Sequence, residues 1–451
     1  MNRFYWSKTI HITKNYAMCW DGRSVSANPD LREWLEATKN KGMALGLENT
    51  NRILSYLNLN FDNTQIIHVA GSNGKGTLCS LIAASLCLNE DSNVLFSSPH
   101  LCRVEERIRL DGRPIDEIKF DQALAQVKTA TEKLKIALTF FETTFLVAMI
   151  VTADINPKLL ILETGLGGRL DATRCAPADL AILTAISKEH TDILGDDIYG
   201  IIGEKAAIAR PGKFLIAREM DIIDYQQTVI NTARNCAKSE LNERADFAVC
   251  KFVKVPDNLS IIDEAELLAE AAFDVLNLDT DNLLKAKSKV NWPARLQVLN
   301  LPSNHRFILD AAHNPSGLAR VKSHLIDLAR KGNETDAITL IFATSPQQQL
   351  GEMLHQINDI CQSFSQVELY LTKPHGGRYP GLNPEELAKF EWEVDVIHTY
   401  SNVTQVIDEI LSKNSVTTGV VLSLGSLYLQ GNILNYLGKN SDDDLSLLPK
   451  Q

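Results

Sequence analysis

Short apolar segments alternate with amphipathic segments along most of this chain. The first four apolar segments are rich in isoleucine, leucine and valine, and they are QIIHVA (65–70), NVLFSS (93–98), KLLILE (158–163) and LAILTAI (180–186). Segments between them, such as DQALAQVKTATEKL (121–134), have the apolar spacing of helices. Short strands that alternate with helices are typical of a mostly parallel sheet covered by helices. In such a sheet, functional residues gather where the strands end.

A second alternating series predicts a second, smaller α/β domain. The change falls in NWPARLQVLNLPSNH (291–305), which contains two prolines. Apolar segments then resume with RFILD (306–310), AITLIFATS (337–345), VELYLT (367–372), VDVIHTY (394–400) and VVLSLGS (420–426). We therefore expect a first domain over residues 1–294 that carries a phosphate-binding loop, and a Rossmann-like α/β domain over residues 295–451.

The two ends of the chain lack this alternation. Residues 1–30 are polar and unpatterned, so we expect an irregular extension there, followed by amphipathic helices at 31–40 and 48–60. The C-terminal residues 439–451 are polar and acidic, and we expect them to fray.

Composition narrows the class of protein. The chain has 451 residues and a net charge of −11, from 45 Lys and Arg against 56 Asp and Glu, which argues against a nucleic-acid partner. The eight cysteines are scattered without a Cys-x-x-Cys pair, so reduced thiols fit better than a zinc site or disulfides. No apolar run has the length of a membrane span, and the N-terminus lacks the apolar core of a signal peptide. We expect a monomeric cytoplasmic protein without membrane contact.

The segment GSNGKGT (71–77) follows the first strand and precedes a helical segment. A glycine-rich turn in this place lets backbone N–H groups face phosphate oxygens at the positive end of the helix. Lys75 could then reach the β- and γ-phosphates of a nucleotide. The common pattern G-x-x-x-x-G-K-[ST] is not met, because Val69 replaces its first glycine and Gly76 follows the lysine. The loop alone therefore leaves open a tight turn with a solvated lysine.

Polar residues also follow the other predicted strands. Ser98 offers a hydroxyl to a metal or a phosphate, and Glu163 is a strand-end carboxylate of the kind that holds Mg²⁺. His190 follows the fourth strand, Lys205 lies in a helical segment, and Asp310 ends the first strand of the second domain. Taken singly, these residues are also compatible with exposed strand ends, a structural histidine, an ordinary helix lysine and an Asx turn.

Taken together, several segments resemble one known family. HVAGSNGKGT, SSPHLCRVEERIRLDGRPI, LETGLGGRLDAT, KEHTDILG, EKAAI, WPARL, LDAAHNP and GSLYLQG occur in the order and spacing of the folylpolyglutamate synthase and dihydrofolate synthase family. This family is a branch of the Mur-type ATP-dependent ligases. The resemblance covers about residues 42–432. The family's loop has the form G-[ST]-N-G-K-G-[ST], which this chain matches at every position.

The resemblance implies an amide ligase. Such an enzyme moves the γ-phosphate of ATP to a substrate carboxylate, and the amino group of L-glutamate then displaces phosphate from the acyl phosphate. It implies ATP and two Mg²⁺ ions as cofactors, with L-glutamate and a folate or pteroate as the other small-molecule partners.

The residues that match the family's motifs fall into four groups. The implied catalytic residues are Lys75, Glu163, His190 and Lys205; the ATP contacts are Gly71, Ser72, Asn73, Gly74, Lys75, Gly76, Thr77, Arg295, Asp310 and His313; the metal ligands are Ser98, Glu163 and His190; and the pterin-side contacts are Thr139, Phe141, Glu142 and Asp171. Lys205 matches a lysine that becomes carbamylated in the family. Phe141 and Asp171 also fit a core aromatic and a turn carboxylate.

Two of the family's motifs are absent. The motif G-x-x-Q-x-x-N-A, whose asparagine contacts ATP, is replaced by VPDNLSIIDEAELLAE (255–270), and a usual D-K-D is replaced by ATSPQQQ (343–349). Three alternatives therefore stay open: a Mur-type ligase with a different pterin or carboxylate acceptor, a non-catalytic nucleotide-binding relative, and a kinase with a phosphate-binding loop.

Overall fold

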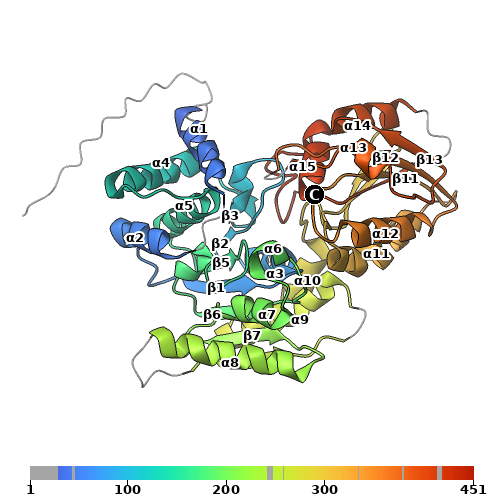
Figure 1. Ribbon diagram of the computed structural model, residues 1–451. Coiled ribbons are helices and arrows are strands. Elements are labelled where there is room, and N and C mark those ends of the chain that lie inside the picture. Colours follow the sequence, from blue (N-terminus) through green and yellow to red (C-terminus); the bar gives the residue numbers. More distant parts are fainter. Residues whose placement is uncertain are drawn as a thin grey trace, which may run out of the picture.

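The computed structural model describes residues 29–42, 46–240, 247–256, 259–333, 335–377, 380–413 and 419–450. The irregular extension that we expected at 1–30 lies outside these residues, apart from its last two, which begin helix α1 (Pro29–Ala37). Figure 1 shows two domains side by side, the first coloured blue to yellow and the second orange to red.

The first domain contains an eight-stranded sheet in the order β4-β3-β2-β5-β1-β6-β7-β8. Its elements are α1, η1 (Thr38–Lys41), α2 (Glu48–Leu57), β1 (Gln65–Ala70), α3 (Lys75–Leu88), β2 (Asn93–Phe96), η2 (Val104–Arg107), β3 (Ile108–Leu110), β4 (Arg113–Pro114), α4 (Glu117–Leu134), α5 (Phe140–Ile155), β5 (Leu159–Glu163), η3 (Ala172–Cys175), β6 (Leu180–Leu183), α6 (Thr191–Leu194), α7 (Ile198–Ala206), β7 (Phe214–Arg218), α8 (Ile223–Glu240), β8 (Val249–Val253), α9 (Ile261–Leu276) and α10 (Leu283–Lys289). All strand pairs are parallel except β2–β3 and β3–β4.

Helices cover both faces of this sheet. Successive side chains of a strand point to opposite faces, so Ile66 of β1 packs with α1, α2, α4 and α5, while Ile67 and Val69 pack with α3, α9 and α10. A strand that is buried on both faces has to be apolar throughout, which explains the continuous run QIIHVA. The α7 and α8 helices cover the remaining part of the first face, over β6 and β7.

The second domain contains a six-stranded sheet in the order β13-β12-β11-β14-β10-β9. Its elements are β9 (Gln297–Asn300), β10 (Arg306–Leu309), α11 (Pro315–Arg330), β11 (Ala337–Phe342), α12 (Leu350–Cys361), β12 (Gln366–Leu371), α13 (Pro384–Leu387), β13 (Val396–Thr399), α14 (Val403–Ser412), β14 (Val420–Leu424) and α15 (Leu427–Tyr436). Only β9 is antiparallel to its neighbour. The α11 and α12 helices pack on one face, and α14 and α15 pack on the other.

The predicted α/β class and the two parallel-dominated sheets are confirmed, and β1 has the predicted bounds. The pattern missed the short antiparallel strands. The β3–β4 hairpin lies inside the charged segment 97–115, and β9 lies inside the segment 291–305, where we placed the change from the first domain to the second. Strands of two to four residues with charged or polar side chains carry too little alternation to be recognised.

The expectation that residues 439–451 fray is wrong for residues 439–450, which the structure describes. The side chain of Leu447 is completely buried in the core that α3, α9 and α10 share. Asn291 donates from Nδ2 to the carbonyl oxygens of Asp444 and Ser446, at 3.0 and 3.1 Å. The leucines of this otherwise polar segment provide enough apolar surface to hold it against the first domain. The end of the chain therefore ties the two domains together.

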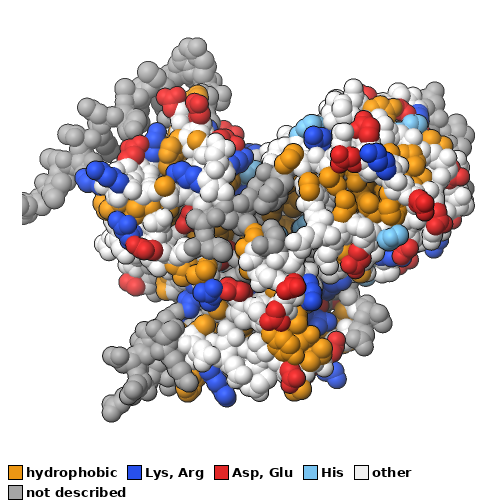
Figure 2. Space-filling view, in the orientation of Figure 1, with side chains coloured by type: hydrophobic (Ala, Val, Ile, Leu, Met, Phe, Trp, Pro, Cys, Tyr) orange, Lys and Arg blue, Asp and Glu red, His pale blue; other side chains and the backbone are white. Residues whose placement is uncertain are grey.

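Figure 2 shows a notch between the two domains at the upper edge of the molecule. Among the helices of the described residues, none is long and apolar enough to cross a membrane. The carboxyl ends of β1, β5 and β6 place the predicted site residues beside the second domain.

Candidate active site

The loop between β1 and α3 is shaped by two glycines. Gly71 has a φ of 147°, and a Cβ atom there would overlap the hydroxyl of Thr184. Gly74 has a φ of 89° and is the cap residue of α3, which begins at Lys75. Both φ values lie in the region that side chains other than glycine rarely adopt. The loop therefore turns tightly into the N-terminus of a 14-residue helix, where its N–H groups are directed towards an anion.

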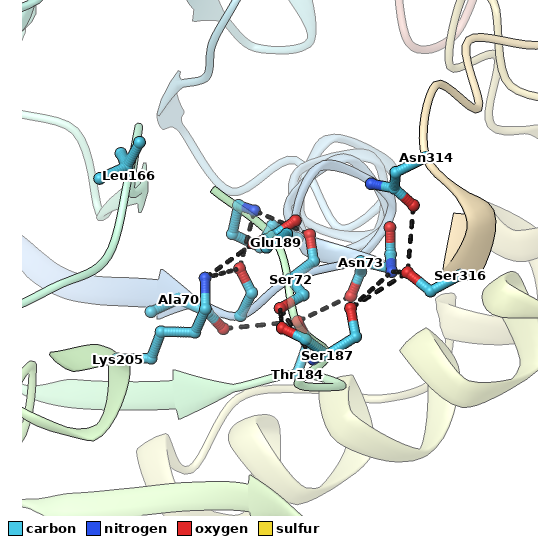
Figure 3. Close-up of polar contacts among 12 residues, drawn as sticks. Ala70, Ser72, Asn73, Leu166, Thr184, Ser187, Glu189, Lys205, Asn314 and Ser316 are labelled. Atoms are coloured by element: carbon cyan, nitrogen blue, oxygen red, sulfur yellow. Dashed lines mark hydrogen bonds and ion pairs between the residues drawn. The ribbon is translucent and has the colours of Figure 1, made fainter. Parts of the chain in front are cut away.

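The segment that follows β6 fixes this loop in place. The N–H of Ser72 donates to the carbonyl oxygen of Ala185 at 2.7 Å, and the N–H of Ser187 donates to the hydroxyl of Ser72 at 2.9 Å. The hydroxyl of Thr184 donates to the carbonyl oxygen of Asn73 at 2.9 Å. Figure 3 shows these contacts converging on the loop. They hold the phosphate-binding loop in one shape before any ligand binds.

Lys75 folds back over its own loop. Its Nζ donates to the carbonyl oxygens of Gly71 and Ser72, at 2.8 and 3.0 Å. These are weak acceptors compared with a phosphate, so the ammonium can turn to a ligand at little cost. Gly76 packs against the linker residue Trp292, because a Cβ atom there would lie 3.0 Å from the indole Nε1. Because Gly76 has no side chain, Trp292 of the linker can lie close to the loop.

The second domain contacts the phosphate-binding loop directly. Asn73 donates from Nδ2 to the hydroxyl of Ser316 at 2.9 Å, and the hydroxyls of Ser187 and Ser316 lie 3.1 Å apart. Ser316 lies in the first turn of α11, which Asn314 caps by accepting a hydrogen bond from the N–H of Gly317 at 2.7 Å. The sequence reasoning missed both serines, since nothing in a serine at a helix start or after a strand marks it as a loop contact.

Glu163 lies beside the loop because β5 pairs with β1, with Val69 opposite Glu163. The carboxylate is buried and accepts a hydrogen bond from the backbone N–H of Ser98, at 3.3 Å. Burial raises its pKa above the ordinary value, while Lys75, the Ser98 N–H and Arg295 act in the opposite direction. A cation bound next to this carboxylate would offset the free-energy cost of burying its charge.

The donor set at this point fits a hard divalent ion. In the part of the chain that the structure describes, no three His, Cys, Asp or Glu side chains gather into a metal-binding group. Mg²⁺ commonly takes one or two carboxylates and completes its shell with water and nucleotide oxygens. The carboxylate of Glu163 and the adjacent Ser98 agree with such a site.

Lys205 and Glu189 form a buried ion pair next to the loop. Lys205 Nζ lies 2.8 Å from Glu189 Oε1 and donates to the carbonyl oxygen of Gly71 at 3.0 Å (Figure 3). Burial lowers the pKa of Lys205, although Glu189 opposes this. Burial would raise the pKa of Glu189, but Lys205, Lys75 and His190 lower it to about 2. The sequence reasoning missed Glu189, although it precedes His190 in the quoted motif.

His190 is exposed and begins α6 from a left-handed conformation with a φ of 51°. It directly follows Glu189, which pairs with Lys205 beside the loop. The structure therefore brings residues of both domains to one place. Their roles as second-metal and nucleotide ligands stay predictions.

Asp310 is buried at the end of β10 and shapes the junction of the domains. Its Oδ2 accepts from the N–H of Leu296 at 2.9 Å, and its Oδ1 accepts from the N–H of Ala312 at 2.8 Å. Burial raises its pKa, and Arg295 counteracts this. His313 lies nearby, with Nδ1 2.9 Å from the carbonyl oxygen of Ala311. This arrangement holds the linker strand β9 against the second domain.

Two of the predicted pterin-side residues form a helix cap. The N–H and the hydroxyl of Thr139 each lie 2.8 Å from Glu142 Oε2, which makes a capping box at the start of α5. Glu142 also accepts from the hydroxyl of Thr50 at 3.3 Å. The polar atoms that we expected to contact a pterin are thus already engaged in holding the helix.

The other two pterin-side residues shape the loop after β5. Asp171 Oδ2 accepts from the N–H groups of Gly165 and Leu166, at 2.9 and 3.0 Å, and burial raises its pKa. The ring of Phe141 lies against Gly165, where a Cβ atom would come within 2.6 Å of Cε2. It also lies 5.6 Å from the ring of Phe96. Pterin contacts for both residues stay predictions.

A phosphate-binding loop at one sheet edge, a buried carboxylate beside it and a second α/β domain that contacts the loop define the class of two-domain ATP-dependent ligases. The chain belongs to the dihydrofolate synthase/folylpolyglutamate synthase family. It is 30% identical over 338 residues to the Escherichia coli dihydrofolate synthase/folylpolyglutamate synthase, covering 71% of this chain and 78% of that relative. It is 25% identical over 421 residues to the dihydrofolate synthetase of Saccharomyces cerevisiae, covering 86% and 97%.

Further comparisons agree with this membership. The family model for the C-terminal domain of dihydrofolate synthetase matches residues 297–436. The structure of E. coli FolC in complex with DHPP and ADP covers 92% of this chain and 98% of its own, with 25% identity and a TM-score of 0.75. A bifunctional folylpolyglutamate synthase/dihydrofolate synthase with Mn, AMPPNP and L-glutamate bound has a TM-score of 0.74 at 25% identity, over 92% and 98%. The chain is therefore an ATP-dependent ligase, and neither a kinase nor a binding protein is needed to explain it.

Proposed function

We propose that this protein joins L-glutamate to the carboxylate of a pteroate or folate, with cleavage of ATP to ADP and phosphate. The observation that carries this proposal is the meeting of four features at one edge of the first sheet: the rigid loop 71–77, the buried Glu163, the Lys205–Glu189 pair and the start of α11. The relatives bound to ADP, AMPPNP and L-glutamate support it.

The reaction has two steps. In the first, an oxygen of the acceptor carboxylate forms a bond to the γ-phosphorus, the bond to the β-phosphate oxygen breaks, and ADP leaves. In the second, the neutral amine of glutamate bonds to the acyl carbon, the C–O bond to phosphate breaks, and the nitrogen loses a proton. The loop N–H groups and Lys75 hold the β- and γ-phosphates, since both are poised around the same helix end.

A divalent metal ion would assist the first step, the transfer of the phosphoryl group. Ser98 and Glu163 would hold one ion, and Glu163 with His190 a second. A bound Mg²⁺ neutralises charge on the transferring phosphoryl group. Around it, this chain's own residues orient the reactants. Asn73 and Thr77 lie at the start of α3. By the family resemblance, Arg295, Asp310 and His313 would contact the nucleoside from the second domain.

Carbamylation of Lys205 is a further part of this proposal. Reaction of the amine with carbon dioxide would replace an ammonium by an anion beside Glu189, which lies 2.8 Å away and has a pKa lowered to about 2. Two neighbouring anions in a buried site repel strongly, so the carbamate needs a cation between them. The modification should therefore form together with metal binding. The lowered pKa of Lys205 favours the neutral amine that carbamylation requires.

The function is tested by product analysis. We would incubate the protein with MgATP and L-glutamate, together with dihydropteroate, tetrahydrofolate or no acceptor, and follow phosphate release and glutamylated products by mass spectrometry. Release that depends on an acceptor supports the proposal, and the acceptor used distinguishes dihydrofolate synthase from folylpolyglutamate synthase activity. If neither acceptor is glutamylated, a different pterin or carboxylate acceptor becomes the leading assignment.

We further propose a monomeric protein of the cytoplasm. In the described part of the chain, all seven cysteines are free, which agrees with a reducing compartment. Light scattering would measure the mass in solution, and fractionation would locate the protein. A dimer mass, or recovery of the protein outside the cytoplasm, would contradict this.

A further inference from the structure

Two arginines, one just before β3 and one within it, are buried without an ionic partner. Arg107 is 7% exposed and Arg109 is 2% exposed. In the described residues, neither lies within ion-pair distance of a carboxylate, whereas their neighbours Arg103 and Arg113 pair with Asp442 and Asp443. A buried cation without a counter-ion is costly, so each guanidinium needs a compensating contact.

The protein itself compensates the charge of Arg109. Its guanidinium lies over the ring of Trp292, 4.8 Å from the centroid, and it donates to the carbonyl oxygen of Glu106. It also donates to the hydroxyl of Ser97 at 3.4 Å. An aromatic face and a carbonyl oxygen partly replace water around a guanidinium. Arg109 therefore has a structural role between the hairpin and the linker.

Arg107 is compensated less completely. Its Nε donates to Nδ1 of His100 at 2.9 Å, its Nη1 lies 3.5 Å from the hydroxyl of Thr144, and it lies 4.9 Å from the ring centroid of Phe140. Since Nδ1 of His100 accepts, the ring hydrogen is on Nε2. Within the described chain, Arg107 Nη2 and His100 Nε2 have no hydrogen-bond partner. These two nitrogens can therefore each donate a hydrogen bond to a ligand, and the positive charge of the guanidinium favours a ligand that is an anion.

The position of Arg107 indicates which ligand uses these donors. Phe140 and Thr144 belong to α5, the helix that also carries Phe141. The N–H of Ser98, two residues before His100, donates to Glu163 at 3.3 Å, and the carbonyl oxygen of Leu101, next to His100, lies against Gly431 on α15 of the second domain. The guanidinium thus lies between the expected pterin side, the carboxylate beside the phosphate-binding loop and the second domain. In a ligase of this type, the carboxylate to be phosphorylated has to occupy this place.

We propose that Arg107, positioned by His100, binds the acceptor carboxylate that receives the phosphoryl group. This inference rests on the proposed function and adds a residue that recognises the reacting group. The free Nη2 of the guanidinium can donate a charge-assisted hydrogen bond to one carboxylate oxygen, and it can keep this bond while the other oxygen becomes bonded to phosphorus. The carboxylate comes either from the benzoate of a pteroate or from the terminal glutamate of a folate.

The test compares binding of a carboxylate with binding of its neutral isostere. We would measure the affinity of the wild-type protein and of R107A, R107K and H100A for dihydropteroate and for its carboxamide, without ATP. R107A should bind dihydropteroate roughly 10- to 100-fold more weakly than the wild type, as expected for the loss of a charged hydrogen bond, and should bind the carboxamide with unchanged affinity. R107K should lose less affinity for dihydropteroate than R107A does. H100A should reduce the preference for the carboxylate by a smaller factor, because it removes a neutral donor and the contact that positions Arg107 but leaves the guanidinium in place.

The control is R113A, which removes an arginine of the same hairpin whose charge Asp443 already pairs on the surface. It should bind both compounds like the wild type. The proposal would be overturned if R107A bound both compounds more weakly by the same factor. It would also be overturned if the wild-type protein bound the carboxylate no more tightly than the carboxamide. If R107A does not fold, the carboxylate preference of R107K decides in its place. Repeating the series with tetrahydrofolate identifies the carboxylate source. Failure of the wild type to glutamylate any acceptor would instead contradict the proposed function.

Discussion

The ammonium of Lys205 lies 2.8 Å from the carboxylate of Glu189, and both side chains are buried next to the phosphate-binding loop. Because the same ammonium donates to the carbonyl oxygen of Gly71, this ion pair connects α7 to the first glycine of the loop. The charges at this point are balanced before any ligand binds. We therefore expect stability and activity to depend on the same two residues.

Replacing Glu189 by glutamine should destabilise the protein. The variant leaves the buried ammonium of Lys205 without a counter-ion, which typically costs about 3–5 kcal/mol. Urea unfolding followed by tryptophan fluorescence would measure the change. The surface pair Lys213–Asp179 provides the control, since K213Q should cost less than about 1 kcal/mol. Equal effects of the two variants would show that Glu189 contributes no more than a surface charge.

The contribution of Glu189 should also depend on pH. Its pKa is about 2 in the folded protein and near 4.5 when unfolded. As the pH falls below 4.5, the unfolded state binds a proton before the folded state does, so the stability provided by the carboxylate decreases towards pH 2. The difference in unfolding free energy between wild type and E189Q should be constant from pH 7 to 5 and shrink below pH 4.5. A difference that grows with acidity would contradict the assignment.

Replacing Gly71 by alanine should distort the phosphate-binding loop. The φ of 147° disfavours any side chain, and the added methyl group would overlap the hydroxyl of Thr184. We expect ATP affinity, measured by calorimetry, to fall at least about 10-fold, with T184A partly restoring it. Gly200 provides the matched control, because a Cβ atom there meets Asp197 at an ordinary 3.5 Å. G200A should bind ATP like the wild type.

Replacing Glu163 by glutamine should weaken metal binding at the proposed site, so that activity falls and more Mg²⁺ is needed to reach it. Charge neutralisation by a metal contributes several kcal/mol to phosphoryl transfer, so we expect kcat to fall by roughly 100-fold or more. Phosphate release at increasing Mg²⁺ would measure this, and EDTA should abolish the wild-type reaction. Glu142, a buried glutamate with a capping role, is the comparison: E142Q should mainly lower stability. Unchanged Mg²⁺ dependence in E163Q would exclude Glu163 as a ligand.

Shortening Leu447 to alanine should weaken the attachment of the C-terminal segment. Removing a completely buried leucine side chain costs about 2–5 kcal/mol. Thermal unfolding would measure the loss, and limited proteolysis should cleave the variant within 439–450. K450A, at an exposed position of the same segment, should leave both properties unchanged. An L447A variant as stable as the wild type would restore the interpretation of a frayed end.

Much of the fold was predictable because burial on both faces of a parallel sheet demands apolar strands. The run 65–70 has the same bounds in the sequence pattern and in the structure. Residues defined by strand ends, such as Glu163 and Asp310, were found for the same reason, since topology places strand ends at one edge. Glu189 and Ser316 were not, because their importance comes from partners distant in the chain, Lys205 and Asn73.

The sequence by itself determined the two α/β domains, the glycine-rich loop at the end of β1 and the resemblance to one ligase family. Only the tertiary structure decided how individual charges are balanced. In the folded protein, Lys205 pairs with Glu189, Arg107 has no carboxylate partner among the described residues, and the C-terminal segment packs into the core of the first domain. The physical reason is that local patterns fix which residues are buried, whereas the energy of a buried charge depends on what the folded chain places beside it.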